Sequence, residues 1–141
     1  MTPEEVFLRY RDVLQSLSAE TLDRLDAVVA PDVRFRDPFH DVRGADSMKG
    51  VFSALFESAR NIVYDIDDWA CGADSVYFRW TLKAELSGKP WSVTGVTQAH
   101  FDDAGRVSDH VEYWDAASQF YERFPVIGSL LRCIRRRIAR P

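Results

Sequence analysis

The chain has 141 residues and a net charge of −4, which is the usual size of one domain and enough to bury a core without disulfides or a structural metal. Hydrophobic residues make up 46% of it and aromatic residues 13%, which argues against intrinsic disorder. Residues 125–141 hold five arginines and no acid, so residues 1–124 carry −9. This acidic body argues against nucleic acid as the principal partner.

The two cysteines, Cys71 and Cys133, stand far apart with no CxxC motif and no histidine-rich neighbourhood. This spacing argues against zinc and against a disulfide framework, and it fits a reducing compartment. The first residues lack the basic, apolar and small-residue progression of a signal peptide. No apolar run approaches the roughly 18 residues needed to span a bilayer. We therefore expect a cytoplasmic protein.

The first segment predicts a helix. Thr2, Pro3 and Glu5 read as its N-cap, a first-turn proline and the partner in a capping box. Its apolar residues repeat at helical spacing and are Val6, Phe7, Tyr10, Val13, Leu14 and Leu17.

Two more helices are predicted before the main run of strands. Ser18 can cap one of them, and Pro31 ends it after Ala30. The other follows Gly44. Its apolar stripe consists of Met48, Val51, Phe52, Leu55 and Phe56.

Segment 33–38 alternates apolar and charged residues and ends at a proline, as a short strand entering a loop does. Four longer alternating stretches follow, at about 62–70, 76–87, 91–102 and 107–115. Short turns separate them, which predicts an antiparallel meander. Helices followed by long adjacent strands indicate an α+β fold with one sheet face resting on helices. The strands are apolar on both parities, so the sheet either curls around its contents or pairs with a second subunit.

A resemblance to the NTF2-like superfamily comes from the order of these elements and from two segments, Val33-Arg34-Phe35-Arg36-Asp37-Pro38-Phe39 and His110-Val111-Glu112-Tyr113-Trp114-Asp115. The SnoaL-like, ketosteroid isomerase and limonene epoxide hydrolase branches are the most similar, over residues 3 to about 120. The resemblance implies a cone: a curved antiparallel sheet packed on three helices, with an internal apolar pocket and often a homodimer formed through the sheet. It does not choose a reaction, because this fold carries isomerases, cyclases, hydrolases and proteins without chemistry.

The ketosteroid isomerases imply roles for three residues. Asp37 matches the carboxylate that moves a proton between carbons at the mouth of an apolar pocket. Tyr10 matches the tyrosine that donates a hydrogen bond to the developing oxyanion. Thr97 stands where that branch has a second, acidic donor. Taken without the resemblance, Asp37 before Pro38 also fits a plain turn, and Tyr10 fits a core aromatic.

The epoxide hydrolases imply a second set. Arg79 and Glu112 lie 33 residues apart, as do the arginine and the water-activating carboxylate of that branch, and Thr81 replaces its second acid. If both residues face inward, Glu112 exchanges protons while Arg79 orients it or binds an anionic substrate oxygen. The alternative is a buried ion pair between them that only stabilises the sheet.

Strand parity extends this second set. Tyr77 shares a face with Arg79, and His110 and Trp114 share a face with Glu112. His110 is the titratable group best suited to exchange protons at neutral pH, although an inward histidine is also a common core group. His40 lies in the loop beside Asp37, either at the pocket mouth or simply as a polar loop residue.

Together these patterns predict a cofactor-independent acid/base enzyme, of the isomerase, cyclase or hydrolase type, that acts on a small apolar carbonyl or epoxide compound. The alternative is a non-catalytic binding module for an apolar molecule, or a dimerisation domain. No spacing recommends a metal site. The catalytic candidates are Tyr10, Asp37, His110 and Glu112, and the substrate-binding candidates are Tyr77, Arg79, Thr81, Thr97 and Trp114.

Residues 1–124 are thus predicted to form the NTF2-like domain, and residues 125–141 a basic amphipathic helix. Apolar residues recur there at intervals of three and four, and arginines fill most of the remaining surface. The helix either makes a peripheral contact with an anionic membrane or docks over the pocket or on the acidic body.

Overall fold

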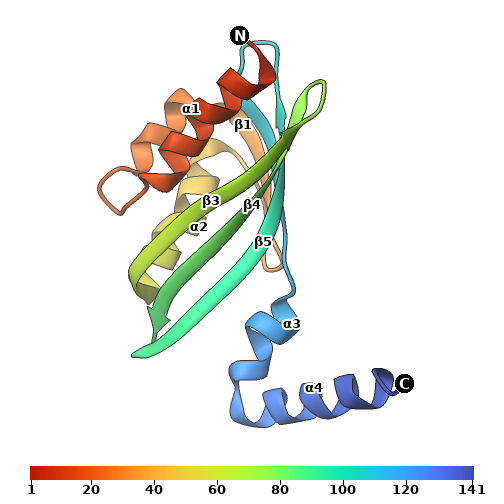
Figure 1. Cartoon of the computed structure of the whole chain (residues 1–141). Helices are drawn as coiled ribbons and strands as arrows, with labels where there is room; N and C mark the ends of the chain where they lie inside the picture. Colours follow the sequence, from red (N-terminus) through yellow and green to blue (C-terminus); the bar gives the residue numbers. More distant parts are fainter.

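A curved sheet of six strands organises the chain (Figure 1), which a computed structural model describes from residue 1 to residue 141. The strand order across the sheet is β2, β1, β6, β5, β4, β3. The strands are β1 (Val29–Arg36), β2 (Asp41–Arg43), β3 (Ala59–Cys71), β4 (Ser75–Leu86), β5 (Lys89–Phe101) and β6 (Val107–Tyr113). The α-helices are α1 (Pro3–Gln15), α2 (Ala45–Ser58), α3 (Ala116–Gln119) and α4 (Pro125–Ile138), and two 3₁₀ helices are η1 (Leu22–Ala27) and η2 (Tyr121–Arg123).

The α+β class and the predicted meander of β3, β4, β5 and β6 are confirmed. The sheet is not wholly antiparallel, because β1 pairs in parallel with β6 and antiparallel with β2. The pairing of β1 with β6 joins segments that are far apart in the chain, and alternation within a strand does not specify such a partner. The short strand β2 was not predicted.

Helices α1 and α2 begin where expected. Thr2 caps α1 through the predicted capping box with Glu5. The second predicted helix is wrong in type and extent: it is the short 3₁₀ helix η1, and strand β1 starts as early as Val29. The residues before Pro31 pair with the sheet instead, since Val28 O accepts a hydrogen bond from Val107 N. The helical side of the cone therefore consists of α1, α2 and η1.

The curvature of the sheet has local causes. Strand β3 shifts register against β4 between Arg60 and Val63 and again between Ile66 and Asp68, and such bulges bend a strand. Asn61 within the first bulge has a positive φ of 53°. The bent meander wraps around one side of the helices, and α1 and α2 lie together on its concave side (Figure 1).

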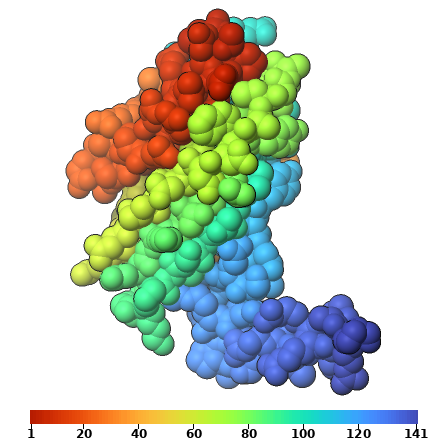
Figure 2. All heavy atoms as spheres, in the orientation of Figure 1, coloured from red at the N-terminus to blue at the C-terminus, as the bar shows by residue number.

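The core fills the space between the concave face and the helices. Helix α1 contributes Phe7, Tyr10 and Leu14, and α2 contributes Met48, all of them buried. The sheet contributes alternate residues, which on β4 are Val76, Phe78, Trp80, Leu82 and Ala84. At the far end, α3, η2 and α4 lie beyond the sheet, with α4 away from the rest of the molecule (Figures 1 and 2).

Gly95 on β5 allows two tryptophans to approach the strand. A Cβ atom at this position would lie 2.6 Å from the Trp80 ring and 3.0 Å from Cβ of Trp114. We expect Gly95→Ala to lower the free energy of unfolding by about 1–3 kcal/mol, the usual effect of overpacking. Urea unfolding measures this.

Gly50 provides a matched control. It is an exposed residue inside α2, and nothing lies within 4 Å of the position that its Cβ would take. Gly50→Ala is expected to raise the free energy of unfolding by up to about 1 kcal/mol, because alanine favours the helix. Equal effects of the two substitutions would contradict the packing around Gly95.

Candidate functional site

A pocket of about 310 Å³ lies between the concave face and the helices, and 18 of its 24 lining residues are hydrophobic. Buried Phe35, Trp80 and His110 line its depth, whereas half-exposed Phe39 and His40 line its mouth. The polar lining consists of Gln15, Asp37, His40, Ser58, His110 and Glu112. An apolar cavity with a few convergent polar groups is the usual form of a small-molecule site.

A chain of buried hydrogen bonds joins α1 to the pocket. The Tyr10 hydroxyl lies 2.7 Å from Nδ1 of His110, and Nε2 of His110 lies 3.1 Å from a carboxylate oxygen of Glu112. Both Tyr10 and His110 are almost completely buried, whereas Glu112 retains about 15% of its side-chain exposure. Phe35 stacks on the imidazole at 5.0 Å between ring centroids. This series of hydrogen bonds therefore ends at Glu112, its most exposed member, which lines the pocket together with His110.

The direction of the protons follows from the chemistry of these groups. An ionised carboxylate only accepts hydrogen bonds. Nε2 of His110 therefore carries the ring proton and donates a hydrogen bond to Glu112. In the neutral ring Nδ1 is then an acceptor, and the Tyr10 hydroxyl donates to it. Burial, together with the nearby Glu112 charge, raises the pKa of Tyr10 well above its ordinary value. Tyr10 is therefore a fixed donor at neutral pH.

This geometry changes the expected role of Tyr10. The hydroxyl bonds to His110 and Tyr10 does not line the pocket, so it does not donate to a substrate oxyanion. His110 and Glu112 lie together on the inner face with Trp114, as strand parity predicted.

Tyr64 on β3 is a pocket residue that the sequence analysis missed. It lines the pocket and packs against the Trp80 ring at 5.7 Å. Only burial and nearby charges act on its hydroxyl, and no hydrogen bond within the chain does. Burial and then the Glu112 charge raise its pKa well above the ordinary value, so it stays a neutral donor. Tyr64 alternates with the apolar residues Ile62 and Ile66, and this alternation could have placed it on the inner face of the strand.

Asp37 and His40 form a second pair of a carboxylate and an imidazole. Oδ1 of Asp37 accepts from the backbone N of Phe39 at 2.8 Å, and Nδ1 of His40 lies 2.9 Å from the same oxygen. The Asp37 side chain is only 11% exposed, and both residues line the pocket. Asp37 thus stabilises the turn between β1 and β2 and also borders the pocket. The two interpretations of this residue are compatible.

Aromatic rings gather where the C-terminal segment meets the pocket mouth. The ring centroid of Phe39 lies 5.5 Å from that of Trp114 and 5.2 Å from that of Phe120. The centroids of Phe120 and Trp91 are 5.9 Å apart. The indole N–H of Trp91 donates to the carbonyl of Gln119 at 2.7 Å. The side chain of Gln119 forms two further hydrogen bonds with the backbone of Thr94 on β5. These contacts hold Phe120 in the pocket lining. Phe120 lies within residues 1–124, the range predicted for the NTF2-like domain.

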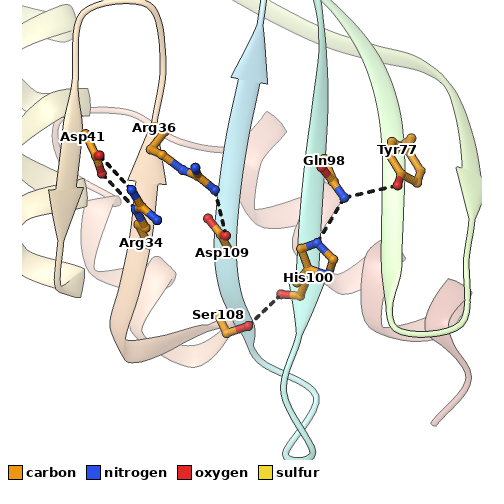
Figure 3. Close-up of polar contacts among 8 residues, drawn as sticks. All are labelled: Arg34, Arg36, Asp41, Tyr77, Gln98, His100, Ser108 and Asp109. Atoms are coloured by element: carbon orange, nitrogen blue, oxygen red, sulfur yellow. Dashed lines mark hydrogen bonds and ion pairs between the residues drawn. The ribbon is translucent and has the colours of Figure 1, made fainter.

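The expected convergence of Arg79 with Glu112 is not found. Arg79 lies on the outer, convex face of β4, half exposed, where its Nε donates to Asp67 at 3.0 Å, and this ion pair raises its pKa. Thr81 lies on the same outer face, 3.4 Å from Thr94 across the strands. Tyr77 accepts from Gln98 there at 3.1 Å (Figure 3).

Arg79 and Thr81 face outward because of the parity of β4. Both parities of this strand carry aromatic residues, and the helices cover the more apolar one, which contains Phe78 and Trp80. A displacement of one residue moves every side chain of a strand to the other face. The residue spacing that suggested Arg79 does not detect such a displacement.

Thr97 lies on the inner face opposite Glu112 across the strands. It is fully buried and outside the pocket lining, and its hydroxyl accepts a hydrogen bond from the Trp80 indole N–H at 2.8 Å. Its position in the fold is as expected, but it orients a tryptophan of the pocket wall rather than facing a ligand.

The arrangement supports proton transfer inside an apolar cavity. Glu112 presents a carboxylate to the pocket, His110 and Tyr10 hold that carboxylate from behind, and Tyr64 offers a free O–H. A carboxylate and a neutral hydroxyl facing one cavity are the elements of general acid/base chemistry with stabilisation of a developing oxyanion. No three His, Cys, Asp or Glu side chains lie close enough to share a metal ion.

Comparison with known families identifies the chain. The family model of the SnoaL-like domain matches residues 10–110, which is most of this chain. The chain therefore belongs to the SnoaL-like family. No curated protein matches the chain.

Solved structures similar to this chain share its NTF2-like fold. A putative SnoaL-like polyketide cyclase from Jannaschia sp. CCS1 is 19% identical with a TM-score of 0.70, covering 82% of this chain and 87% of its own. An NTF2-like protein of unknown function from Burkholderia pseudomallei K96243 is 16% identical with a TM-score of 0.71, covering 80% and 92%. An LEH-like epoxide hydrolase from M. tuberculosis is 17% identical with a TM-score of 0.66, covering 82% and 84%. The predicted family and fold are thereby confirmed.

The buried phenol of Tyr10 couples folding to pH. Its pKa in the folded chain lies above the value of 10.0 for a free tyrosine, so the unfolded chain releases this proton first as pH rises, and stability falls above pH 10. One such group changes the free energy of unfolding by up to about 1.4 kcal/mol per pH unit. We expect Tyr10→Phe to make this alkaline decline shallower in urea unfolding.

The control for this measurement is Tyr113→Phe, which removes a tyrosine that is 60% exposed. It should leave the alkaline slope of the wild-type protein unchanged. At neutral pH, Tyr10→Phe should itself lower the free energy of unfolding by about 1–3 kcal/mol, because Nδ1 of His110 loses its buried donor. Equal alkaline slopes for Tyr10→Phe and the wild type would contradict the buried phenol.

Proposed function

We propose that this chain is a cofactor-independent acid/base enzyme that acts on a small apolar carbonyl or epoxide compound. The observation that carries the proposal is the buried hydrogen-bond chain from Tyr10 through His110 to Glu112, which ends in an apolar pocket. A purely structural ion pair would not need to face a cavity. The SnoaL-like family is consistent with isomerase, cyclase and hydrolase chemistry of this kind.

In this proposal Glu112 is the proton-exchanging group. It takes a proton from a carbon beside a carbonyl, or from a water that attacks an epoxide, and returns a proton in the second half of the reaction. His110 and Tyr10 act as positioning residues, since they hold the carboxylate in one orientation. Tyr64 donates its free hydroxyl to the oxygen on which negative charge develops.

Asp37 and His40 supply the second proton-exchanging group at the pocket mouth. Nδ1 of His40 is paired with Asp37, so its other ring nitrogen is left for a ligand. An epoxide opening needs one group to activate water and another to protonate the leaving oxygen. The pair at the mouth and the pair at the back therefore provide a complete acid/base set without Arg79 or Thr81.

The test uses two probe compounds of the expected class: a β,γ-unsaturated cyclic ketone, whose isomerisation is followed by ultraviolet absorbance, and a cyclic terpene epoxide, whose diol is measured by gas chromatography. The wild-type protein is expected to turn over one of them. Glu112→Gln should lower kcat by about 100- to 10,000-fold, the usual contribution of a general acid or base. Tyr64→Phe should lower it by about 100-fold or more.

Glu85→Gln is the matched control, because Glu85 is exposed on β4, and it should leave kcat unchanged. The pocket is monitored separately by the binding of an apolar fluorescent probe. Turnover that survives Asp37→Asn, His110→Ala and Glu112→Gln alike would sink the acid/base assignment.

A non-catalytic binding module is the second candidate. It is favoured by the lining itself, in which 18 of 24 residues are hydrophobic, and by the Asp37 carboxylate, which is already bound by the turn. On this interpretation a ligand that copurifies with the protein is bound tightly and is recovered unchanged after incubation. Mass spectrometry of the extracted ligand separates the two candidates.

We also propose a homodimer formed through the outer face of the sheet. Val96 and Tyr113 are paired across β5 and β6 there, and both are substantially exposed. Nearby on the same face, Arg36 and Asp109 form an ion pair at 2.9 Å, and both side chains are about one-third exposed (Figure 3).

Sedimentation velocity tests the dimer. We expect the wild-type chain to sediment as a dimer and Val96→Glu as a monomer, since a charge in the centre of an interface is left unpaired. Leu130→Glu, on α4 and away from the sheet, should sediment as the wild type does. A monomeric wild type would refute the interface.

A further inference from the structure

Helix α4 packs with its polar face toward the chain. Nη1 of Arg132 donates to the carbonyl of Glu122 at 2.7 Å, and Arg135 forms an ion pair with the Glu122 carboxylate at 3.1 Å. Gly128 lies on the same side, where a Cβ atom would overlap the Glu122 carbonyl oxygen. The packing of α4 within the chain is with η2. The helix therefore contacts residues 1–124 through the acidic Glu122, but none of its residues lines the pocket, so it does not dock over the pocket as one expectation had it.

The apolar side of α4 consequently faces solvent. Val126 and Ile138, near the two ends of the helix, are each about 80% exposed. The full apolar stripe consists of Val126, Ile127, Leu130, Ile134 and Ile138. Figure 2 shows the helix projecting from the rest of the molecule. All five side chains of the stripe are 46% to 81% exposed, so the chain leaves the stripe largely uncovered. Contiguous apolar surface on a soluble chain marks an interaction site.

The charge of the helix selects the occupant. Residues 125–141 carry five arginines and no acid, and Arg136 and Arg137 form no ion pair in the structure. A second copy of the helix packed on the stripe would bring two such sets of arginines together. A surface with an apolar interior and anionic headgroups satisfies both halves of the helix. No helix of this chain is long and apolar enough to cross a bilayer.

We propose that α4 lies in the interface of an anionic lipid bilayer, with its apolar stripe among the acyl chains and its arginines at the phosphates. The helix then attaches the domain to the membrane surface by one short element. Basic amphipathic helices of this kind bind by buried apolar area together with attraction to anionic lipid.

The same attachment brings the pocket mouth to the lipid. Helix α4 follows η2 directly, η2 follows Phe120, and Phe120 is part of the pocket lining beside Phe39. The hydrogen bonds of Gln119 to Thr94 fix this connection to β5. An apolar ligand would enter the pocket from the bilayer rather than from water, a consequence that rests on the proposed apolar ligand and is separate from the binding of α4 itself.

Cosedimentation of the full chain with vesicles tests the proposal without any substrate. We expect binding to vesicles of phosphatidylcholine with phosphatidylglycerol and much weaker binding to phosphatidylcholine alone. Leu130→Glu should abolish it. Arg136→Gln combined with Arg137→Gln should weaken it roughly 30-fold, which is the ratio that about 1 kcal/mol per basic residue gives for two residues.

Val63→Glu is the matched control, because it places the same charge on an apolar residue of comparable exposure on β3, and it should bind as the wild type does. Circular dichroism and urea unfolding show that each variant is folded. The proposal is overturned if the wild type does not bind the anionic vesicles or binds both vesicle types equally. It is also overturned if the wild type ignores vesicles and self-associates in a manner that Leu130→Glu removes, since the occupant would then be a second copy.

Discussion

A fully buried imidazole requires a partner at each of its nitrogens, and the cone is arranged around this requirement. His110 obtains one partner from helix α1, in Tyr10, and the other from its own strand, in Glu112. An unpaired polar group at this depth would cost about 1–3 kcal/mol. The hydrogen bonds therefore fix the position of α1 over the sheet, and they also fix the direction of the one carboxylate that faces the depth of the pocket. Stability of the fold and orientation of the site depend on the same contacts.

The curvature of the sheet converts this core into a pocket. Bulges in β3 bend the meander, and Gly95 lets the Trp80 ring and Cβ of Trp114 lie close against the strand. The space that remains is mostly apolar, and the two pairs of a carboxylate and an imidazole supply its titratable groups together with the hydroxyl of Tyr64. The pairs Asp37–His40 and Glu112–His110 keep the hydrogen bonds that stabilise the fold and still line the cavity. The same residues can therefore serve both stability and chemistry.

The C-terminal segment is bound to this pocket at one end and unpartnered at the other. Gln119 and Phe120 bond and pack at the pocket mouth, whereas α4 presents its apolar stripe outward because Glu122 occupies its arginine face. A helix of the core would instead turn its apolar stripe toward the rest of the chain and its arginines toward solvent. The orientation of α4, rather than its composition, distinguishes a docking element from a helix of the core.

Much of this protein could be predicted from its sequence, because helical and strand periodicity are local. The residues themselves determined helices α1 and α2, the meander of β3 to β6, the inward face of His110 and Glu112, and the basic amphipathic pattern of α4. Only the tertiary structure decided which parity of β4 faces inward, and it excluded Arg79 and Thr81 from the pocket while admitting Tyr64. It also decided the parallel pairing of β1 with β6, the bond that commits Tyr10 to His110, and the outward face of the C-terminal helix. The strand pairing and the bond of Tyr10 depend on contacts between residues distant in the chain, and the face of α4 depends on how it packs on η2. A sequence that is apolar on both faces of a strand does not specify which face is covered.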